Sequence, residues 1–458
     1  MKHAEFLALC ARAHTGAACK KSDFDMERVV EPVMDLVEEY GLDWDRQDLI
    51  PTDERVLRSI YDAAVGLLEQ AGVFNITTNR IMRLSRGEIE RGAANMKRSL
   101  VMGEGKDAVT LRVRKIEDVR PPVIWAGNPG CPTPERFFYE NVLASAKEPV
   151  VDLLTCGSLA DVDGFSVTPD SPGEVLAVRR ELRYVRRALD AVGRPGMGLL
   201  TAQSAVTEVG DYAAVGEGRM RGCDAHLIAI FNELAMDNGN LVRAANALDG
   251  GARNASLACT MVGGLGGDAP GAAVVMVASM LAANLFGMAD YHLCHPIHIR
   301  NVATTERGCL WVQAVVCQIF STIAPGIVVC DIWPASGALT KELLYETAAN
   351  SILATVAGGH LEGVGAANGN RPNGTGLEVR LMGEVGKAVA AQGMTRKEAN
   401  EIVLRLLERY EHVFAEKDGN PGVAFDEAYD LAAVEPVPAW QRMYDEVRRE
   451  LIELGVRL

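Results

Sequence analysis

Apolar and polar positions follow two rhythms along the chain. In the first 115 residues, apolar side chains recur with helical spacing over residues 23–41 and 53–72. Ser85 and Glu88 form the signature of a capping box, which marks a helix start. Residues 107–115 alternate apolar and polar like an exposed strand. We therefore expect an N-terminal region of helices followed by a hairpin.

A second rhythm follows, in which short β-rich apolar runs alternate with loops and segments of helical periodicity. Eight such runs occur, at residues 121–127, 150–156, 194–200, 224–231, 254–262, 290–299, 326–333 and 360–368. Alternation of this kind implies a parallel sheet, and eight cycles in about 260 residues fit an α/β fold of the (β/α)8 TIM barrel type. An open doubly wound sheet is the alternative, although no GxGxxG follows the first run and no P-loop occurs.

The barrel pattern occupies only the middle of the chain. We predict a single domain over residues 1–458, with a helical and hairpin extension at 1–115, a barrel core at 116–393 and C-terminal helices at 394–458. Thr395 and Glu398 form a capping box at the start of the last region. No linker rich in Pro, Gly or Ser separates the three parts.

Composition narrows the functional classes. Lys and Arg total 46 and Asp and Glu total 61, so the net charge of −15 argues against nucleic-acid partners and against anionic membranes. No run of eighteen uninterrupted apolar residues suggests a membrane span. The ten cysteines are scattered without a CxxC, which is typical of reduced core thiols in a cytoplasmic protein.

The barrel rule places functional side chains at the carboxyl ends of the strands. Strand three carries the glycines of GRPGMG (193–198), expected to form a close-packed strand end at the mouth, and then Leu200 and Gln203. Strand seven carries Asp331 and, on the same face, Trp333. A carboxylate beside an aromatic ring can hold an alkylammonium ion, whereas pairing of Asp331 with an arginine would be purely structural.

Two further candidates lie near the ends of strands five and six. Asp268 follows a glycine-rich loop, where it is either a helix N-cap or a functional carboxylate. In HLCHPIH, the residues His292, Cys294 and His298 share one face of a strand, and His295 points to the other. Side chains spaced this way are too spread to converge on one metal unless Pro296 introduces a bulge, so we expect no metal.

Several segments, in order and at similar spacing, resemble one family. They are YGLDW (40–44), IPTDERV (50–56), GEGKDAV (103–109), GRPGMG (193–198), HIR (298–300) and LMGEV (381–385). The chain resembles the corrinoid-dependent monomethylamine methyltransferases nearly end to end. The resemblance implies a (β/α)8 barrel and transfer of a methyl group from methylamine to the Co(I) of a small corrinoid protein docked at the mouth. It also implies a homo-oligomer, with no tightly bound cofactor of its own.

The departures from that family concern the pocket. The family's pyrrolysine, whose imine is thought to capture the amine, aligns with Leu200. Of two family glutamates, one aligns with Leu227 and the other falls at about Pro270 or Gly271, with Asp268 close by. Near Asp331 the family has a glutamine, and near Trp333 it has a tyrosine.

The resemblance therefore implies a kept scaffold and a rebuilt pocket. We expect a methylated, quaternary amine as the methyl donor, because its leaving group is already a neutral amine. Leu200 and Leu227 would shape the pocket, Asp331 and Asp268 would balance the cation, and Trp333 would stack on it. Gln203 and His298 complete the expected substrate-binding set. The alternatives are an O- or S-methyl donor with metal assistance and a non-catalytic barrel that binds a ligand or a corrinoid protein.

Overall fold

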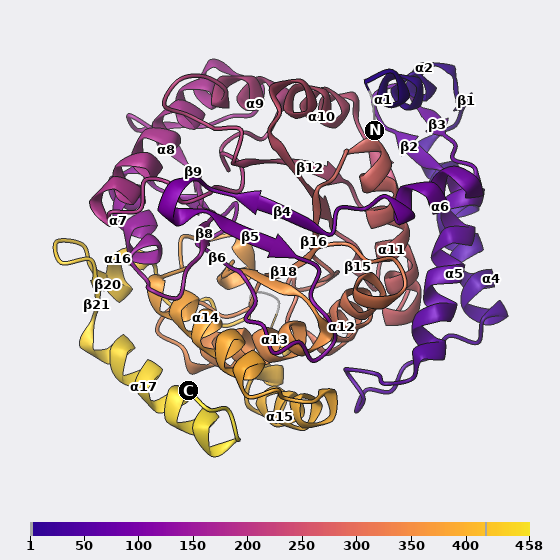
Figure 1. Cartoon of the computed structure of the whole chain (residues 1–458). Coiled ribbons are helices and arrows are strands. Elements are labelled where there is room, and N and C mark those ends of the chain that lie inside the picture. Colours follow the sequence, from indigo (N-terminus) through magenta and orange to yellow (C-terminus); the bar gives the residue numbers. More distant parts are fainter. Residues whose placement is uncertain (1–2, 417–418) are drawn as a thin grey trace.

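The computed structural model describes residues 3–416 and 419–458. Its centre is a ring of parallel strands surrounded by helices (Figure 1). Seven strands are hydrogen-bonded in the order β12-β14-β16-β18-β19-β6-β8. In chain order they are β6 (Ile124–Ala126), β8 (Leu153–Leu154), β12 (Ala225–Ile230), β14 (Arg253–Ala258), β16 (Tyr291–Cys294), β18 (Val328–Ile332) and β19 (His360–Gly363).

A very short segment closes the ring between β8 and β12. Leu199 makes a parallel bridge to Leu154, and Leu200 makes one to Ala225. The amide of Leu200 donates to the Leu154 carbonyl at 2.9 Å, and the amide of Ala225 donates to the Leu199 carbonyl at 2.9 Å. Residues 199–200 thus act as the third strand, and the predicted TIM barrel is confirmed.

A helix follows each of the eight strands, as the alternating pattern predicted. These helices are α7 (Glu135–Ala146), α8 (Pro172–Ala191), α9 (Glu208–Ala214), α10 (Asn238–Gly250), α11 (Ala269–Phe286), α12 (Arg307–Thr322), α13 (Lys341–Ala357) and α14 (Gly376–Ala391). By length and composition α11 could cross a membrane, yet 94% of it is buried inside the protein, as in a core helix.

The N-terminal region packs helices on the outside of the barrel. Ser85 and Glu88 form the expected capping box, and α5 packs against α11. The principal elements are α1 (His3–Cys10), α2 (Arg12–Thr15), α4 (Glu31–Glu39), α5 (Glu54–Ala71), α6 (Arg86–Ala94) and the short strands β2 (Val73–Asn75) and β3 (Arg80–Met82). At the other terminus, α15 (Arg396–Tyr410) and α17 (Pro438–Glu453) pack on α13, and Thr395 and Glu398 cap α15 as predicted.

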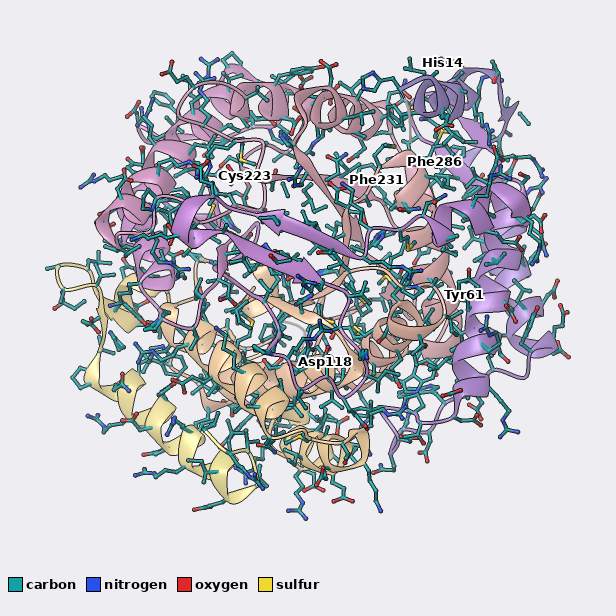
Figure 2. All side chains as sticks on the ribbon, in the orientation of Figure 1. His14, Tyr61, Asp118, Cys223, Phe231 and Phe286 are labelled. Atoms are coloured by element: carbon teal, nitrogen blue, oxygen red, sulfur yellow. The ribbon has the colours of Figure 1, made fainter. Side chains whose placement is uncertain are left out.

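A hairpin closes the amino end of the barrel. Its strands, β4 (Ser99–Met102) and β5 (Val109–Arg112), cross in front of the ring of strands in Figure 1. Leu100, Met102 and Leu111 join the apolar cluster inside the barrel, so this hairpin is only partly the exposed strand expected from its sequence. Cys223 and Asp118, labelled in Figure 2, precede β12 and β6 in the sequence and so lie at this amino end of the barrel.

Gly196 and Gly198 of GRPGMG pack against this hairpin and do not lie at the mouth, which corrects the expectation from sequence. The amide of Glu104 donates to the carbonyl of Gly196 at 2.8 Å. A Cβ on Gly196 would lie 2.2 Å from the Glu104 carbonyl, and one on Gly198 would lie 2.7 Å from the Gly103 amide. The glycines therefore allow the hairpin turn to contact the start of strand three, and the mouth begins only after Leu200.

Candidate functional site

The carboxyl end of the barrel is the accessible end of its interior. Strand alternation directs Leu227 and Ala229 of β12 inward, as it does Leu257 and, just after β14, Cys259. These four inward positions keep partial exposure, whereas their outward neighbours are buried. Because the hairpin covers the other end, solvent reaches these side chains through the mouth.

Two carboxyl groups lie side by side below this mouth. Asp331 of β18 is the register partner of Glu362 of β19, so both side chains point into the barrel. Asp331 is 4% exposed and Glu362 is 1% exposed. Burial, and then the neighbouring charge of Asp331, raise the pKa of Glu362 well above its ordinary value. In the described residues, Asp331 pairs with a histidine, so the arginine partner that the sequence left open is not found.

His295 lies against Asp331, and Trp333 packs against His295. Nδ1 of His295 lies 2.9 Å from Oδ2 of Asp331, at an angle too poor for a hydrogen bond. The rings of His295 and Trp333 meet edge to face, with centroids 4.7 Å apart and planes at 88°. His295 therefore occupies the inward face of strand six, opposite His292, as the alternation indicated, although sequence analysis did not select it for the site.

Two glycines form a slot for the Trp333 ring. A Cβ on Gly365 would lie 2.5 Å from Cδ1 and Nε1 of the indole, and one on Gly369 would lie 2.3 Å from Cζ3. The indole remains partly exposed, and its Nε1–H has no hydrogen-bond partner in the described chain. The ring is thus held in place between these two backbone segments.

Leu200 and Gln203 occupy different depths. Leu200 is fully buried in the apolar cluster that includes Trp125 and Leu153, and so it forms part of the pocket floor. Gln203 lies at the mouth, where its Nε2 donates to Oγ1 of Thr155 at 2.9 Å. The carboxyl of Glu181 on α8 accepts from the amides of Gln203 and Ser204 and fixes this loop.

Asp268 and His298 are not brought together with this group. Asp268 is exposed, caps α11 through the amide of Ala269 and accepts from Nε1 of Trp44 at 3.1 Å, so the N-cap interpretation is confirmed. His298 belongs to β17 (Ile297–His298), which pairs with β15 (Met261–Val262) on the rim. Pro270 and Gly271, suggested as the place of a family glutamate, are buried within α11 and do not line the pocket.

The three possible metal ligands of strand six do not converge. His292 points outward, where its ring is tilted against that of Phe320 of α12 and shares a 2.7 Å hydrogen bond with Ser256. Burial lowers the pKa of His292 to about 4. Cys294 also lies outside the barrel interior, near Cys317 and Cys330, and His298 is on the rim. No group of three His, Cys, Asp or Glu side chains in the described residues is arranged to hold a metal.

Sequence analysis could not show which polar groups at the strand ends are buried without partners, because that depends on contacts between strands. Glu362, Asn128 and Asn368 each bury a side-chain oxygen without a hydrogen-bond partner among the described atoms, and Oδ1 of Asp331 is a fourth. All four residues lie at the carboxyl ends of strands one, seven and eight. Their position after a predicted strand was the available signal.

Cavity size alone would place the functional site away from the mouth of the barrel. A cleft of about 950 Å³ lies between α1, α6 and the carboxyl ends of α10 and α11, which is the amino end of the barrel strands. Arg12 pairs there with Glu88 and Lys97 with Asp290. We place the site at the mouth instead, because the buried unpaired polar groups and the accessible inward positions occur there.

Comparison with known proteins identifies the family and agrees with the fold. The family described as "Monomethylamine methyltransferase MtmB" matches residues 5–456. Monomethylamine methyltransferase MtmB1 of Methanosarcina barkeri is 32% identical over 97% of this chain and 96% of its own length, and MtmB of Methanosarcina mazei is 30% identical over the same shares. The crystal structure of the M. barkeri enzyme superposes with a TM-score of 0.95 at 31% identity, over 99% of this chain and 98% of that one. A structure described as the hydroxylamine complex of MtmB matches equally well. The chain belongs to the monomethylamine methyltransferase family and is a methyltransferase.

Proposed function

We propose that this methyltransferase removes a methyl group from a methylated ammonium ion, quaternary in the favoured case, and delivers it to a corrinoid carried by a partner protein. The observation that supports the substrate class is the combination of a buried acid pair, Asp331 and Glu362, with the slotted indole of Trp333. Carboxylate charge and an aromatic face are the two features that recognise alkylammonium ions.

The pocket floor supports a substrate that needs no covalent capture. Leu200 and Leu227 are hydrocarbon side chains, and the part of the chain described here places no amine or imine group beside them. A quaternary nitrogen already leaves as a neutral amine, so the residues need only hold the methyl carbon in line with the acceptor. Apolar walls around that carbon exclude water and preserve this orientation.

The rim suits a docked corrinoid protein. Phe231, Ile299 and Val206 follow strands on the open side and are 37%, 48% and 56% exposed, and Phe231 is labelled in Figure 2. Such exposed apolar side chains fit the face of a corrin macrocycle or of its carrier. When docked, the corrinoid supplies Co(I), the nucleophile for the methyl carbon. Asp331 and Glu362 retain the cation, and Trp333 orients it.

Turnover of a substrate panel tests this proposal. The protein is incubated with Co(I) cobalamin and monomethyl-, dimethyl-, trimethyl- and tetramethylammonium, and with larger quaternary amines. We expect loss of Co(I) absorbance and equimolar appearance of the demethylated amine with a quaternary substrate. The substrate class is wrong if no methylated amine is consumed above the rate without protein.

A further inference from the structure

Asp331 and Glu362 form a carboxyl pair whose one nearby basic side chain in the described residues is the His295 imidazole. Neighbouring parallel strands are about 4.8 Å apart, so register partners that point the same way bring their carboxyl groups close together. Across residues 3–416 and 419–458, neither group forms an ion pair with Arg or Lys. Oδ1 of Asp331 and Oε2 of Glu362 are buried and accept no hydrogen bond.

The groups around the pair supply little compensation for two negative charges. Thr155, the residue after β8, offers a hydroxyl to Glu362, and His295 approaches Asp331 from the end of β16. The other titratable groups near the pair are neutral at pH 7, because burial, with the charge of Asp331 or Glu362, raises the pKa of each. They are Cys131, Cys259, Cys294, Cys330 and Tyr291. Glu233, further along the mouth, is a third acid, and its charge also raises the pKa of Cys259. Two adjacent carboxylates in such surroundings do not both ionise at neutral pH.

We propose that Asp331 and Glu362 share one proton, so that the pair presents a single negative charge to a single substrate cation, and that this proton passes to the amine after the methyl group leaves. The inference rests on the proposed function for its substrate. Glu362 then becomes a residue that matters to the reaction, because it sets the charge that the pocket offers.

The proton balance of the step is simple. The carbon–nitrogen bond breaks with its electron pair going to nitrogen, and the methyl group goes to the partner's cobalt. The neutral amine now faces a carboxylic acid and takes its proton, which leaves two carboxylates opposite an ammonium product. Repulsion between these carboxylates lasts until the product leaves and a solvent proton restores the pair. No oxidant or further reactant is needed.

Titration calorimetry with tetramethylammonium tests the shared charge. In Glu362→Gln the charge stays on Asp331, and in Asp331→Asn it moves to Glu362, so we expect each single variant to bind within about fivefold of the wild type. Asp331→Asn/Glu362→Gln has no charge left and should bind about a hundredfold more weakly. Glu148→Gln, which alters a buried glutamate at the opposite end of the barrel, controls for a general effect of such changes.

Infrared difference spectra detect the proton directly. We expect a protonated-carboxyl band in the wild type at pH 7 that is missing from Glu362→Gln and retained in Glu148→Gln. This comparison is needed because the carboxyls of Glu181, Glu346 and Glu378, each with a pKa of about 7, also contribute to the band. At higher pH the wild type should bind tetramethylammonium more tightly as the second charge appears, and Glu362→Gln should not.

The two proposals fail differently. Single variants as weak as the double variant, or equal infrared spectra for wild type and Glu362→Gln, would overturn the shared proton. Wild-type protein that does not bind tetramethylammonium at all would overturn the quaternary-amine substrate, while the infrared band would still decide how the pair is protonated.

Discussion

Trp333 is the residue on which the proposed recognition of a cation most depends. Its side chain is partly exposed, its ring and that of His295 meet edge to face, and Asp331 lies two residues before it on the same strand face. Attraction between a ring face and a cation is worth up to about 2 kcal/mol when water is excluded. Under the proposed function, the indole would favour methylated ammonium ions.

Replacement of the indole should weaken tetramethylammonium binding, and more so when the aromatic ring is removed than when a smaller ring replaces it. We expect Trp333→Leu to bind tetramethylammonium about tenfold to thirtyfold more weakly, and Trp333→Phe only a few-fold more weakly. Calorimetry measures both constants, with unfolding in urea as a check on the fold. Equal losses in the two variants would show that the aromatic face is not used.

The slot behind the ring provides a second test at single-residue scale. Gly365→Ala introduces a Cβ 2.5 Å from the indole, so the ring must shift. We expect weaker tetramethylammonium binding and a stability loss of about 1–3 kcal/mol. Gly250→Ala is the matched control, because nothing lies within 4 Å of the added methyl group. Unchanged affinity in Gly365→Ala would show that the ring position does not matter for binding.

At the scale of elements, the third strand is the weakest part of the ring. Only residues 199–200 pair with their neighbours, and an ionic cluster supports them. Oδ1 of Asp224 accepts from the amide of Leu199 at 2.9 Å, and the same carboxylate pairs with Arg186 and Arg221. The Asp224 side chain is fully buried, so these bonds are shielded from solvent.

Loss of this carboxylate should destabilise the barrel strongly. Asp224→Asn leaves Arg186 and Arg221 without their buried partner, and we expect a loss of about 3–5 kcal/mol in the free energy of unfolding. Urea denaturation monitored by circular dichroism measures it. The pair of Arg180 with the exposed carboxylate of Asp163 is the control, since Asp163→Asn should change the free energy of unfolding far less. Similar losses in both variants would contradict the support of strand three by Asp224.

The sequence was informative about elements and less so about their contacts. Periodicity located all eight strands and the helix after each, and capping boxes at Ser85 and Thr395 marked helix starts, because these signals are local. The adjacency of Asp331 and Glu362 depends on strand register across thirty residues, which no local pattern encodes. The role of the GRPGMG glycines was misjudged for the same reason, since their partner is the hairpin turn at Gly103 and Glu104.

Buried carboxyls anchor the open end of the whole molecule. Glu181, Glu346 and Glu378, on α8, α13 and α14, each accept backbone amides from loops that follow the strands. Burial is the main cause that raises the pKa of each to about 7, against the opposing effect of these hydrogen bonds. The loops around the site are thus tied to groups that titrate near neutral pH.

Stability should therefore fall as the pH rises through neutrality. Because folding raises these pKa values from 4.5 to about 7, the stabilisation is complete below pH 4.5 and is lost as the pH rises through about 7. We expect the stability of the wild type, relative to Glu346→Gln, to decrease between pH 5 and pH 8. Urea unfolding at four pH values measures this difference, and a constant difference would contradict the raised pKa of Glu346.

Within the described residues, the hairpin of β4 and β5 covers the amino end of the barrel and leaves the carboxyl end as the accessible one, and this has a kinetic consequence. If the corrinoid protein docks on the same mouth through which the amine enters, the small molecule cannot pass while the two proteins are together. Turnover then has a compulsory order. The donor binds first, the partner protein docks, the methyl group is transferred, the partner dissociates, and the amine leaves last. The stripped amine should compete with the donor for the free enzyme, and partner dissociation should limit the rate whenever carrier is abundant.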